Sequence, residues 1–568
     1  MRTPFFAVFV LGVSACASNA SQPQTNPGAT PGTPKAPVSQ RSPIGSGAVL
    51  IENARVYGHP GATSLLVVDG RIHKLGGTEL DAQLAARRVD AKGGVLLPGF
   101  HDAHVHMMSG GLSLSRVDIE GAKTVDETLA QVKAWADANP QAPWVIGRGW
   151  SYDIVPKGTF PTAAMLDRVV SDRPCALNAY DGHTVWLNSK ALAAAHIVKE
   201  TLAPPGGTIV KDAGGVPTGA LLEDAEVLLD EVIPPPTRAQ KKAAFLAAAQ
   251  HLVKLGVTAV DAIEAGPESM ELLLELEQEG ALPFFVQLYL PIDSDLDQLS
   301  ALREKSTQRV RLAGVKGFVD GVIESKTAYM VQPYEGEAHA RGKPILGPKE
   351  LFGLVDAADA RGFQVLLHAI GDGAVRLALD AFERTHRAHP YITRRHRVEH
   401  IEVLHKDDAA RFSDTWSMAS MQPYHATPGD GDPNAGAWSE NVGKSRLPHT
   451  FPWRSLLDKR VGLAFGSDWP VFTASPLWGL AVATTRRSAT GNPKEGWNRH
   501  QAITMDEAIA AYTTDRGEAA GPSLSVGRIA VGQRADLVLL SPDAKLEEPL
   551  SLFQAKVALT MVEGRVVH

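Results

Sequence analysis

The chain alternates short apolar runs with polar turns and longer amphipathic stretches over most of its length. Such runs, bounded by Gly, Pro or Asp, are typical of buried strands, and the stretches between them have helical spacing. Most successive runs begin about 20 to 50 residues apart, as right-handed βα units require. Eight runs are predicted as barrel strands: residues 95–106, 257–263, 284–290, 315–321, 364–371, 397–403, 417–423 and 462–468. They predict an α/β fold, a (β/α)8 barrel, over residues 98–515.

Both ends of this region carry shorter, strand-like segments. Residues 48–97 and 516–568 contain apolar runs with Gly and Asp turns, such as SLLVVDGRIHKLG and KVALTMVEGRVVH. We expect these two ends to pair into one small β-sandwich. The first two barrel runs are separated by residues 107–256, far more chain than one helix needs. We therefore expect an inserted domain after the first barrel strand, at about residues 112–238.

The N-terminus has the pattern of an export signal. Arg2 precedes a short apolar stretch, residues 5–13, that is too short to span a bilayer. The following VSAC resembles the lipobox of bacterial lipoproteins. It predicts a signal peptide over residues 1–16, a lipid on Cys16, and an exported protein anchored in the bacterial cell envelope; cleavage nearby without a lipid is the alternative. Residues 17–47 are rich in Ser, Pro, Thr, Gly and Gln and predict a disordered linker.

Composition narrows the range of partners. The net charge is −7, and no block of basic residues predicts a nucleic-acid or acidic-membrane surface. The expected partner is a small-molecule substrate, with a membrane contacted only through the lipid anchor, and a homodimer stays open. The chain has one other cysteine, Cys175, so no internal disulfide is available when Cys16 is acylated.

Histidines and an aspartate lie where a barrel enzyme gathers its active site. His104 and His106, at i and i+2, share one face of a strand, although such pairs also arise by chance in a chain with 19 histidines. His368, His400 and Asp468 each lie near the C-terminal end of a different predicted strand. Imidazole and carboxylate are ligands that zinc prefers, and a bound cation offsets the cost of burying them together. We therefore expect a site for zinc or a similar divalent metal.

Lys316, in GVKGFVDG, is a further candidate for this site. A surface lysine on an edge strand is the alternative interpretation, but a closed barrel has no edge strand. An inward lysine beside cations loses its proton, because burial and like charge both lower its pKa. We therefore expect a neutral amine at this position.

These segments together resemble the amidohydrolase superfamily and, within it, the amidohydrolase-3 branch that includes YtcJ-like proteins and N-substituted formamide deformylases. The resemblance covers nearly all of residues 48–568. It rests on LLPGFHDAHVH, PTGALLEDA, VKGFVDG, HAIGDGAV, RHRVEHIE, the QP of SMQP, FGSDWPV and SVGRIAVGQRADLVLL. It implies a metal-bearing barrel, a β-sandwich built from both ends and a domain inserted after the first strand.

The resemblance also implies roles for the candidate residues. It makes His104 and His106 ligands of one metal ion. It makes His368 and His400 ligands of a second ion. It places Asp468 beside the attacking water. Lys316 matches a lysine that many relatives carboxylate to bridge two metals, and Glu223 in TGALLEDA is the alternative bridge; with neither, a single metal is expected. The loop after VKGFVDG departs from many relatives, with Ile323 and Glu324 in place of small residues.

The predicted function is metal-assisted hydrolysis of a non-peptide carbon–nitrogen bond in a linear or N-substituted amide. Asp468 would take the proton of the attacking water and pass it to the leaving amine. Substrate contacts are expected from His183, Trp150 and Tyr329, each of which also fits plain packing. A lipid-anchored binding protein without turnover is one alternative. Another is a different metal-assisted reaction, such as isomerisation or phosphoester hydrolysis, since a fold alone does not set chemistry.

Overall fold

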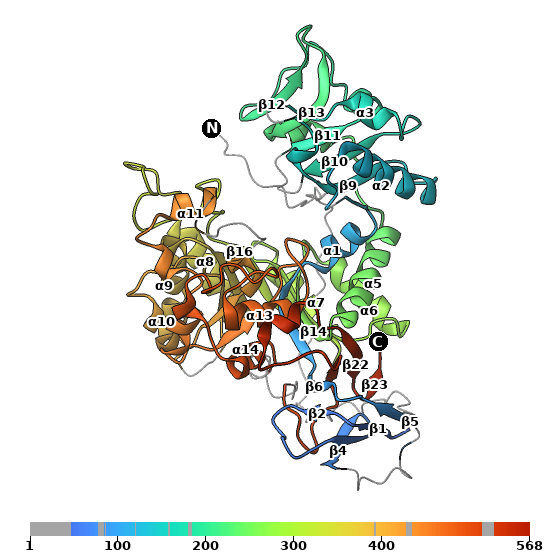
Figure 1. The fold of residues 1–568 in the computed structure, drawn as a ribbon. Helices are drawn as coiled ribbons and strands as arrows, with labels where there is room; N and C mark the ends of the chain where they lie inside the picture. The colour runs from blue at the N-terminus through green and yellow to red at the C-terminus, as the bar shows by residue number, and fades with distance from the viewer. Residues whose placement is uncertain are drawn as a thin grey trace, which may run out of the picture.

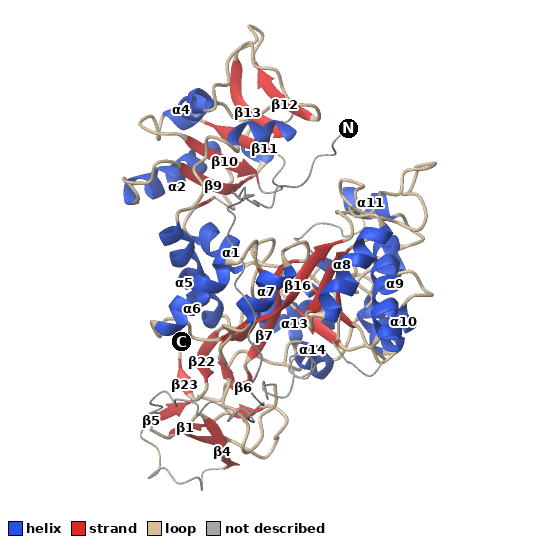
Figure 2. Cartoon of the chain, turned by 180° about the vertical axis from the view of Figure 1, so that it is seen from behind, coloured by secondary structure: helices blue, strands red, loops and turns tan. Residues whose placement is uncertain are grey.

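The computed structural model describes residues 47–77, 85, 87–119, 121–156, 159–179, 184–390, 394–427, 434, 436–513 and 527–568. Within these ranges the chain forms a central barrel, an inserted sheet, a sheet of N-terminal strands, and a sheet that combines both ends of the described chain (Figure 1, Figure 2). The predicted signal peptide with Cys16, nearly all of the predicted linker, and His183 lie outside the described residues. In the described part of the chain, no helix combines the length and the apolar character that a membrane span requires.

The central sheet has eight parallel strands in the order β20-β19-β18-β17-β16-β15-β14-β7. They are β7 (Phe100–Val105), β14 (Val257–Ile263), β15 (Phe285–Pro291), β16 (Val310–Phe318), β17 (Gln364–Ala369), β18 (Arg397–His400), β19 (Met418–Met421) and β20 (Leu463–Phe465). Each overlaps one predicted run, so the (β/α)8 barrel is confirmed. These strands read as continuous apolar runs because a parallel sheet is covered on both faces.

Helices follow the barrel strands along the chain, and most of them pack against these strands. They are α1 (Met107–Leu114), α5 (Arg238–Lys254), α6 (Glu268–Gln278), α7 (Leu296–Arg303), α8 (Pro348–Ala360), α9 (Asp372–Ala388), α10 (Ala409–Asp414), α11 (Ala437–Val442), α12 (Trp453–Leu457), α13 (Pro476–Thr485) and α14 (Met505–Ala511). On α9, Val375, Leu379 and Phe382 recur at helical spacing and lie in the same core as the strand residues. The start of α5 is fixed by a capping box between Thr237 and Gln240.

The ring closes between β20 and β7 through backbone hydrogen bonds at the carboxyl ends of the two strands. The Asp468 N–H donates to the His104 carbonyl at 2.7 Å, and the His106 N–H donates to the Trp469 carbonyl at 3.0 Å. Gly466 permits this close approach, because a Cβ atom there would lie 2.5 Å from the His104 backbone nitrogen. The first and last barrel strands therefore meet at the predicted metal-binding residues.

Two further sheets lie outside the barrel: one of order β4-β3-β1-β5 comes from the N-terminal segment alone, and one of order β2-β6-β21-β22-β23 combines residues from both ends of the described chain. Their strands are β1 (Val49–Glu52), β2 (Arg55–Val56), β3 (Ser64–Val68), β4 (Arg71–Gly76), β5 (Arg87–Asp90), β6 (Val95–Pro98), β21 (Leu537–Leu540), β22 (Val557–Val562) and β23 (Arg565–Val566). Ile51, Val67, Leu537 and Met561 belong to one shared core. In Figure 1 the blue and dark red strands lie together below the barrel.

The first predicted run, residues 95–106, is divided between two strands. β6 pairs antiparallel with β21 in a terminal sheet, whereas β7 pairs with β14 in the barrel. Gly99 joins them, and a Cβ atom there would lie 2.3 Å from the Thr258 side chain. A single glycine therefore carries the chain from the terminal sheet into the barrel.

A mixed sheet of order β12-β13-β11-β10-β9-β8 lies between α1 and α5 in the chain and stands apart from the barrel in both views (Figure 1, Figure 2). Its elements are β8 (Val117–Asp118), α2 (Val125–Ala138), β9 (Val145–Trp150), α3 (Ala163–Asp167), β10 (Cys175–Ala179), β11 (Thr184–Leu187), α4 (Ser189–Ala194), β12 (Gly207–Lys211) and β13 (Pro217–Glu223). Cys175 is buried in it. The exact unit boundaries expected from the sequence stay predictions.

Candidate metal centre

Six residues singled out in the sequence come together at the carboxyl end of the barrel. They are His104 and His106 at the end of β7, Lys316 in β16, His368 in β17, His400 in β18 and Asp468 after β20. Ring centroids are 4.5 Å apart for His368 and His400, 4.9 Å for His400 and His104, and 5.5 Å for His104 and His106. Such a convergence of imidazoles is typical of a site for a divalent cation.

The Asp468 carboxylate lies among these rings. Its Oδ1 is 3.1 Å from His106 Nε2 and 3.4 Å from His104 Nε2. With these two histidines it forms one set of donor atoms within 4.8 Å of one another, and with His400 and His425 it forms a second. Its backbone has a φ of 59°, in the left-handed region that Asp and Asn enter more readily than most residues. The same carboxylate therefore serves two potential cation sites.

Burial sets these histidines in the protonation state that metal binding requires. It lowers the pKa of His104 to about 4 and that of His368 to about 3, and it takes the pKa of His400 well below its usual range. All three rings are therefore neutral at pH 7, as ligands must be. Burial by itself raises the pKa of Asp468, but the neighbouring imidazoles outweigh it and hold this pKa well below its usual range.

Lys316 points its amine into the same centre. The side chain is buried, and Nζ lies 3.5 Å from His104 Nε2 and 4.9 Å from the centroid of the Phe318 ring. Burial lowers the pKa of Lys316 to about 8, although the Glu399 and Asp468 carboxylates oppose the shift. A fraction of the amine is therefore neutral near physiological pH.

A buried chain of ion pairs fixes His104 from behind. Glu399 Oε2 lies 2.5 Å from His104 Nδ1, and Glu399 Oε1 accepts from Arg397 Nε at 2.7 Å. Arg397 also bonds to Asp261 and donates to the Ala103 carbonyl at 2.7 Å. A carboxylate on Nδ1 leaves Nε2 free to face a cation. Arg397 and Glu399 were not among the predicted site residues, although two charged side chains at i and i+2 in a barrel strand are a signal for a buried polar network.

We expect Glu399→Gln to weaken divalent-cation binding about 10- to 100-fold, because an amide orients His104 less firmly and makes its ring a poorer donor. Chelator competition on the purified full chain, followed by elemental analysis, measures the change. Glu52→Gln, at the partly buried end of β1 in a terminal sheet, is the matched control. Equal cation affinity in Glu399→Gln and the unmodified protein would contradict the role of this carboxylate.

His400 and His368 are held by neighbouring polar groups. His400 Nδ1 lies 2.9 Å from Gln422 Oε1, and His368 Nε2 lies 3.2 Å from the Gly321 carbonyl oxygen. His400 and Ile401 have φ values of 75° and 50°, and this conformation is rare for a β-branched residue such as isoleucine. The strained turn therefore sits directly at a candidate ligand, as strain often does at functional sites.

Three other predicted residues lie elsewhere or at the edge of the centre. Glu223 ends β13 in the inserted sheet with an exposed side chain, and it belongs to neither donor set found in the described chain. Trp150 is fully buried in the core of that sheet and donates to the Leu177 carbonyl, so it offers no surface to a substrate. Tyr329 lies in the loop after β16, where its N–H donates to Asp320 Oδ2 at 2.8 Å.

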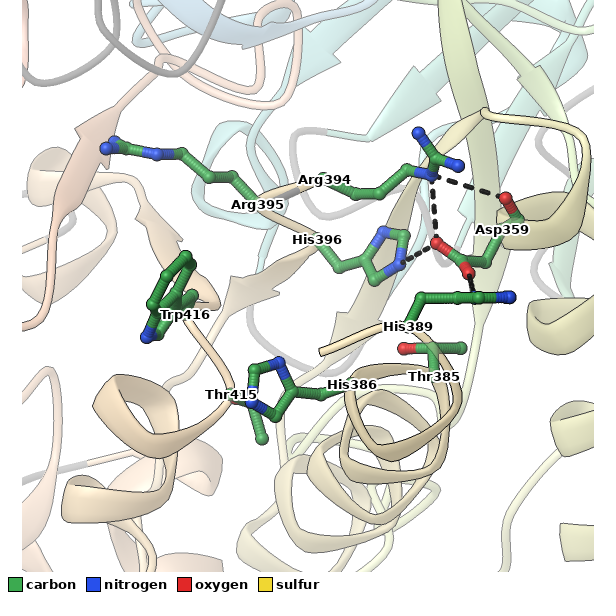
Figure 3. A pocket seen from close by; sticks show the side chains of 9 residues that line it. All are labelled: Asp359, Thr385, His386, His389, Arg394, Arg395, His396, Thr415 and Trp416. Atoms are coloured by element: carbon green, nitrogen blue, oxygen red, sulfur yellow. Dashed lines mark hydrogen bonds and ion pairs between the residues drawn. The ribbon is translucent and has the colours of Figure 1, made fainter. Parts of the chain in front are cut away.

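A second cluster of histidines lies at the amino end of the barrel, beside the residues that precede β17 and β18 (Figure 3). There Asp359 lies 2.7 Å from His389, 3.0 Å from Arg394 and 3.2 Å from His396. The cavity that this cluster lines measures about 20 Å³, room for about one water molecule. Barrel enzymes place their chemistry at the carboxyl end, so this cluster does not compete with the centre around Asp468.

A (β/α)8 barrel with imidazoles and a carboxylate at its carboxyl end defines a class, the metal-dependent hydrolases. The chain belongs to the amidohydrolase family, whose match spans residues 87–568, and this confirms the predicted amidohydrolase-3 branch. The chain is therefore a metal-dependent amidohydrolase, and the metal is a divalent cation.

Individual relatives agree with this assignment. The chain is 30% identical to YtcJ of Bacillus subtilis (strain 168), over 84% of this chain and 90% of that one. It is 29% identical to N-substituted formamide deformylase of Arthrobacter pascens, over 89% and 94% of the two chains. It is also similar to an uncharacterized metal-dependent hydrolase from Pyrococcus horikoshii OT3, with a TM-score of 0.70 and 25% identity over 92% of this chain and 100% of that one.

Proposed function

We propose that this amidohydrolase cleaves a non-peptide carbon–nitrogen bond in a linear or N-substituted amide. The proposal rests on the position of Asp468, whose carboxylate lies 3.1 Å from His106 and belongs to both donor sets. An ionised carboxylate beside candidate metal ligands suits hydrolysis, in which one water proton must be carried to the leaving group. The similarity to N-substituted formamide deformylase supports the choice of bond.

His104, His106 and Asp468 would hold a zinc-type cation, with His400 and His368 available to a second. The donor set fits, because neutral imidazoles and a carboxylate are zinc ligands. A divalent cation bound there would lower the pKa of a water molecule from its high bulk value to about 7 and would polarise the scissile carbonyl. The protein's own residues supply the remaining steps.

Asp468 carries the proton. Its carboxylate accepts one proton from the water whose oxygen bonds to the amide carbon. The same proton then passes to the amide nitrogen as the carbon–nitrogen bond breaks, so a carboxylic acid and an amine are released. The backbone hydrogen bond from Asp468 to His104 keeps the carboxylate beside the ligands throughout.

Lys316 is proposed to carry a carboxyl group that bridges two cations. Its neutral amine would bond to the carbon of CO₂ and release one proton, and burial favours that neutral form. Carbon-13 NMR of the protein supplied with labelled bicarbonate should show a carbamate signal that is absent in Lys316→Ala. A spectrum without this signal in the metal-replete protein would rule the bridge out.

The test of the function is turnover by metal-replete protein on a panel of N-formyl amines, N-acyl amines, cyclic amides and phosphodiesters. We expect release of one amine per linear amide consumed, loss of this activity with chelator, and recovery with Zn²⁺. Turnover restricted to cyclic amides or phosphodiesters would refute the proposed bond, and binding without turnover would favour a non-catalytic protein.

The VSAC segment supports a second proposal, that the protein is exported and held at a membrane by a lipid on Cys16. In bacterial cells, the full chain should partition into detergent and Cys16→Ser should not. A soluble, unlipidated wild-type protein would contradict this.

A further inference from the structure

The ring of Phe318 is exposed at the carboxyl end of the barrel, beside the metal centre. Phe318 ends β16 and is 42% exposed, whereas Lys316, two residues earlier, is buried. Side chains at i and i+2 of a strand lie on one face, and Lys316 Nζ lies 3.5 Å from His104 Nε2. The Phe318 ring therefore belongs to the inward face of β16, at the end where the metal centre opens.

Two polar groups of the centre contact this ring. The ring centroids of Phe318 and His368 are 5.2 Å apart, and Lys316 Nζ lies 4.9 Å from the Phe318 centroid. Phe318 also stands opposite His368 in the register between β16 and β17. An apolar group of a ligand bound at the centre would remove the exposed ring surface from water, which is favourable. The ring thus offers such a ligand an apolar contact next to the candidate metal ligands.

The strand order places Phe318 across the barrel from Asp468. Going around the ring, β17, β18 and β19 separate β16 from β20 on one side, and β15, β14 and β7 separate them on the other. In the proposed reaction Asp468 passes a proton to the amide nitrogen, so the amine part of the substrate lies on the β20 side. The acyl part, on the other side of the bond that breaks, then extends toward the end of β16.

We infer that Phe318 binds an apolar group on the acyl side of the substrate, so that the preferred amide carries an alkyl or aryl acyl chain. The inference rests on the proposed function and deepens it by naming the acyl group. A formyl group has no carbon beyond its carbonyl that could cover the ring, whereas a longer chain covers it and an aromatic chain also gains ring–ring contact. Phe318 is therefore a specificity-determining residue for the chain length of the acid that is released.

The experiment measures kcat/KM of the metal-replete full chain on two series of amides. One series joins a single amine to formyl, acetyl, hexanoyl and phenylacetyl groups, and the other joins acetyl to methylamine, hexylamine and benzylamine. Phe318→Ala removes the ring, and Phe318→Leu keeps an apolar side chain without it. Trp416→Ala, at an exposed aromatic residue of the amino end of the barrel, is the matched control. Calorimetry with acetohydroxamate and phenylacetohydroxamate, which bind cations without turnover, and metal analysis accompany every variant.

In the unmodified protein kcat/KM should rise with the length of the acyl chain. The ratio of phenylacetyl to acetyl amide should fall about 10- to 200-fold in Phe318→Ala, the range for apolar contacts in a pocket, and less in Phe318→Leu. The control should keep the ratio, and the preference for phenylacetohydroxamate should fall in the same order.

An unchanged ratio in Phe318→Ala would overturn the inference, as would a preference that follows the amine series and not the acyl series. An equal fall on every substrate together with a loss of cation would also overturn it, because that pattern belongs to a ring that only supports His368. If no amide is cleaved but the hydroxamate preference depends on Phe318, the proposed function is refuted and the apolar subsite is supported.

Discussion

Replacing Asp468 by asparagine should lower amide turnover by about 10²- to 10⁴-fold, the loss expected when a positioned proton acceptor is removed. An amide side chain has the same shape but neither accepts the water proton nor delivers it to the leaving nitrogen. Asparagine also tolerates the left-handed φ of 59° at this position and keeps the backbone bond to His104. The variant should therefore fold like the unmodified protein and lose most of its amide turnover.

Single-turnover kinetics at saturating Zn²⁺ measure this loss, because Asp468 also belongs to both donor sets and its variant binds cations more weakly. Asp69→Asn, in a turn between β3 and β4, is a matched control. It makes the same substitution at a residue that also has a left-handed backbone, with a φ of 48°, and Asp69 does not contact the metal centre. Turnover within a few-fold of the unmodified protein at full metal occupancy would show that another group carries the proton.

Replacing Arg397 by methionine should lower the free energy of unfolding by about 3–5 kcal/mol, the usual cost of removing one partner of a buried ion pair. Its guanidinium is fully buried and holds Asp261, Glu399 and the Ala103 carbonyl together. Methionine fills much of the volume but leaves two carboxylates without their shared cation. Glu399 also supports His104, so cation affinity should fall in the same variant.

Urea unfolding of the metal-free and metal-replete full chain separates the loss of stability from the loss of metal. Arg88→Met provides the comparison, because Arg88 makes two hydrogen bonds to Glu52 on an exposed strand and should cost far less. If the two variants unfold at the same urea concentration, the buried network does not stabilise the barrel.

The sequence predicted the barrel well because its strands are buried on both faces and leave an unmistakable apolar signal. β14 matches the predicted run at both ends. β16 begins at Val310, five residues before the predicted run, and the prediction missed this start because Arg311 interrupts the apolar pattern. The buried apolar run also indicated where the Lys316 side chain lies, since a polar residue inside such a run must face other polar groups. The apolar pattern did not predict the break at Gly99, because the run over residues 95–106 continues without interruption from one sheet into the other.

The candidate centre was recoverable only in part. His104 lies near the end of β7, and His106 and Asp468 come shortly after β7 and β20, so their position in the chain also gives their position in space. His425 sits in a turn, where no periodicity tells which way a ring points. Glu223 shows the converse: a family-like segment identified the residue as an alternative bridge, but its strand belongs to the inserted sheet and its exposed side chain lies outside both donor sets of the described chain.

The closure of the barrel between β20 and β7 also determines when during synthesis the donor set of the metal centre is complete. His104 and His106 are synthesised early, whereas Asp468, which completes their donor set, is synthesised more than 360 residues later. A product that ends before β20 leaves β7 without its hydrogen-bonded neighbour on that side and has no Asp468 carboxylate at the centre. The donor set of His104, His106 and Asp468 is therefore complete only after β20 has been synthesised and has joined β7.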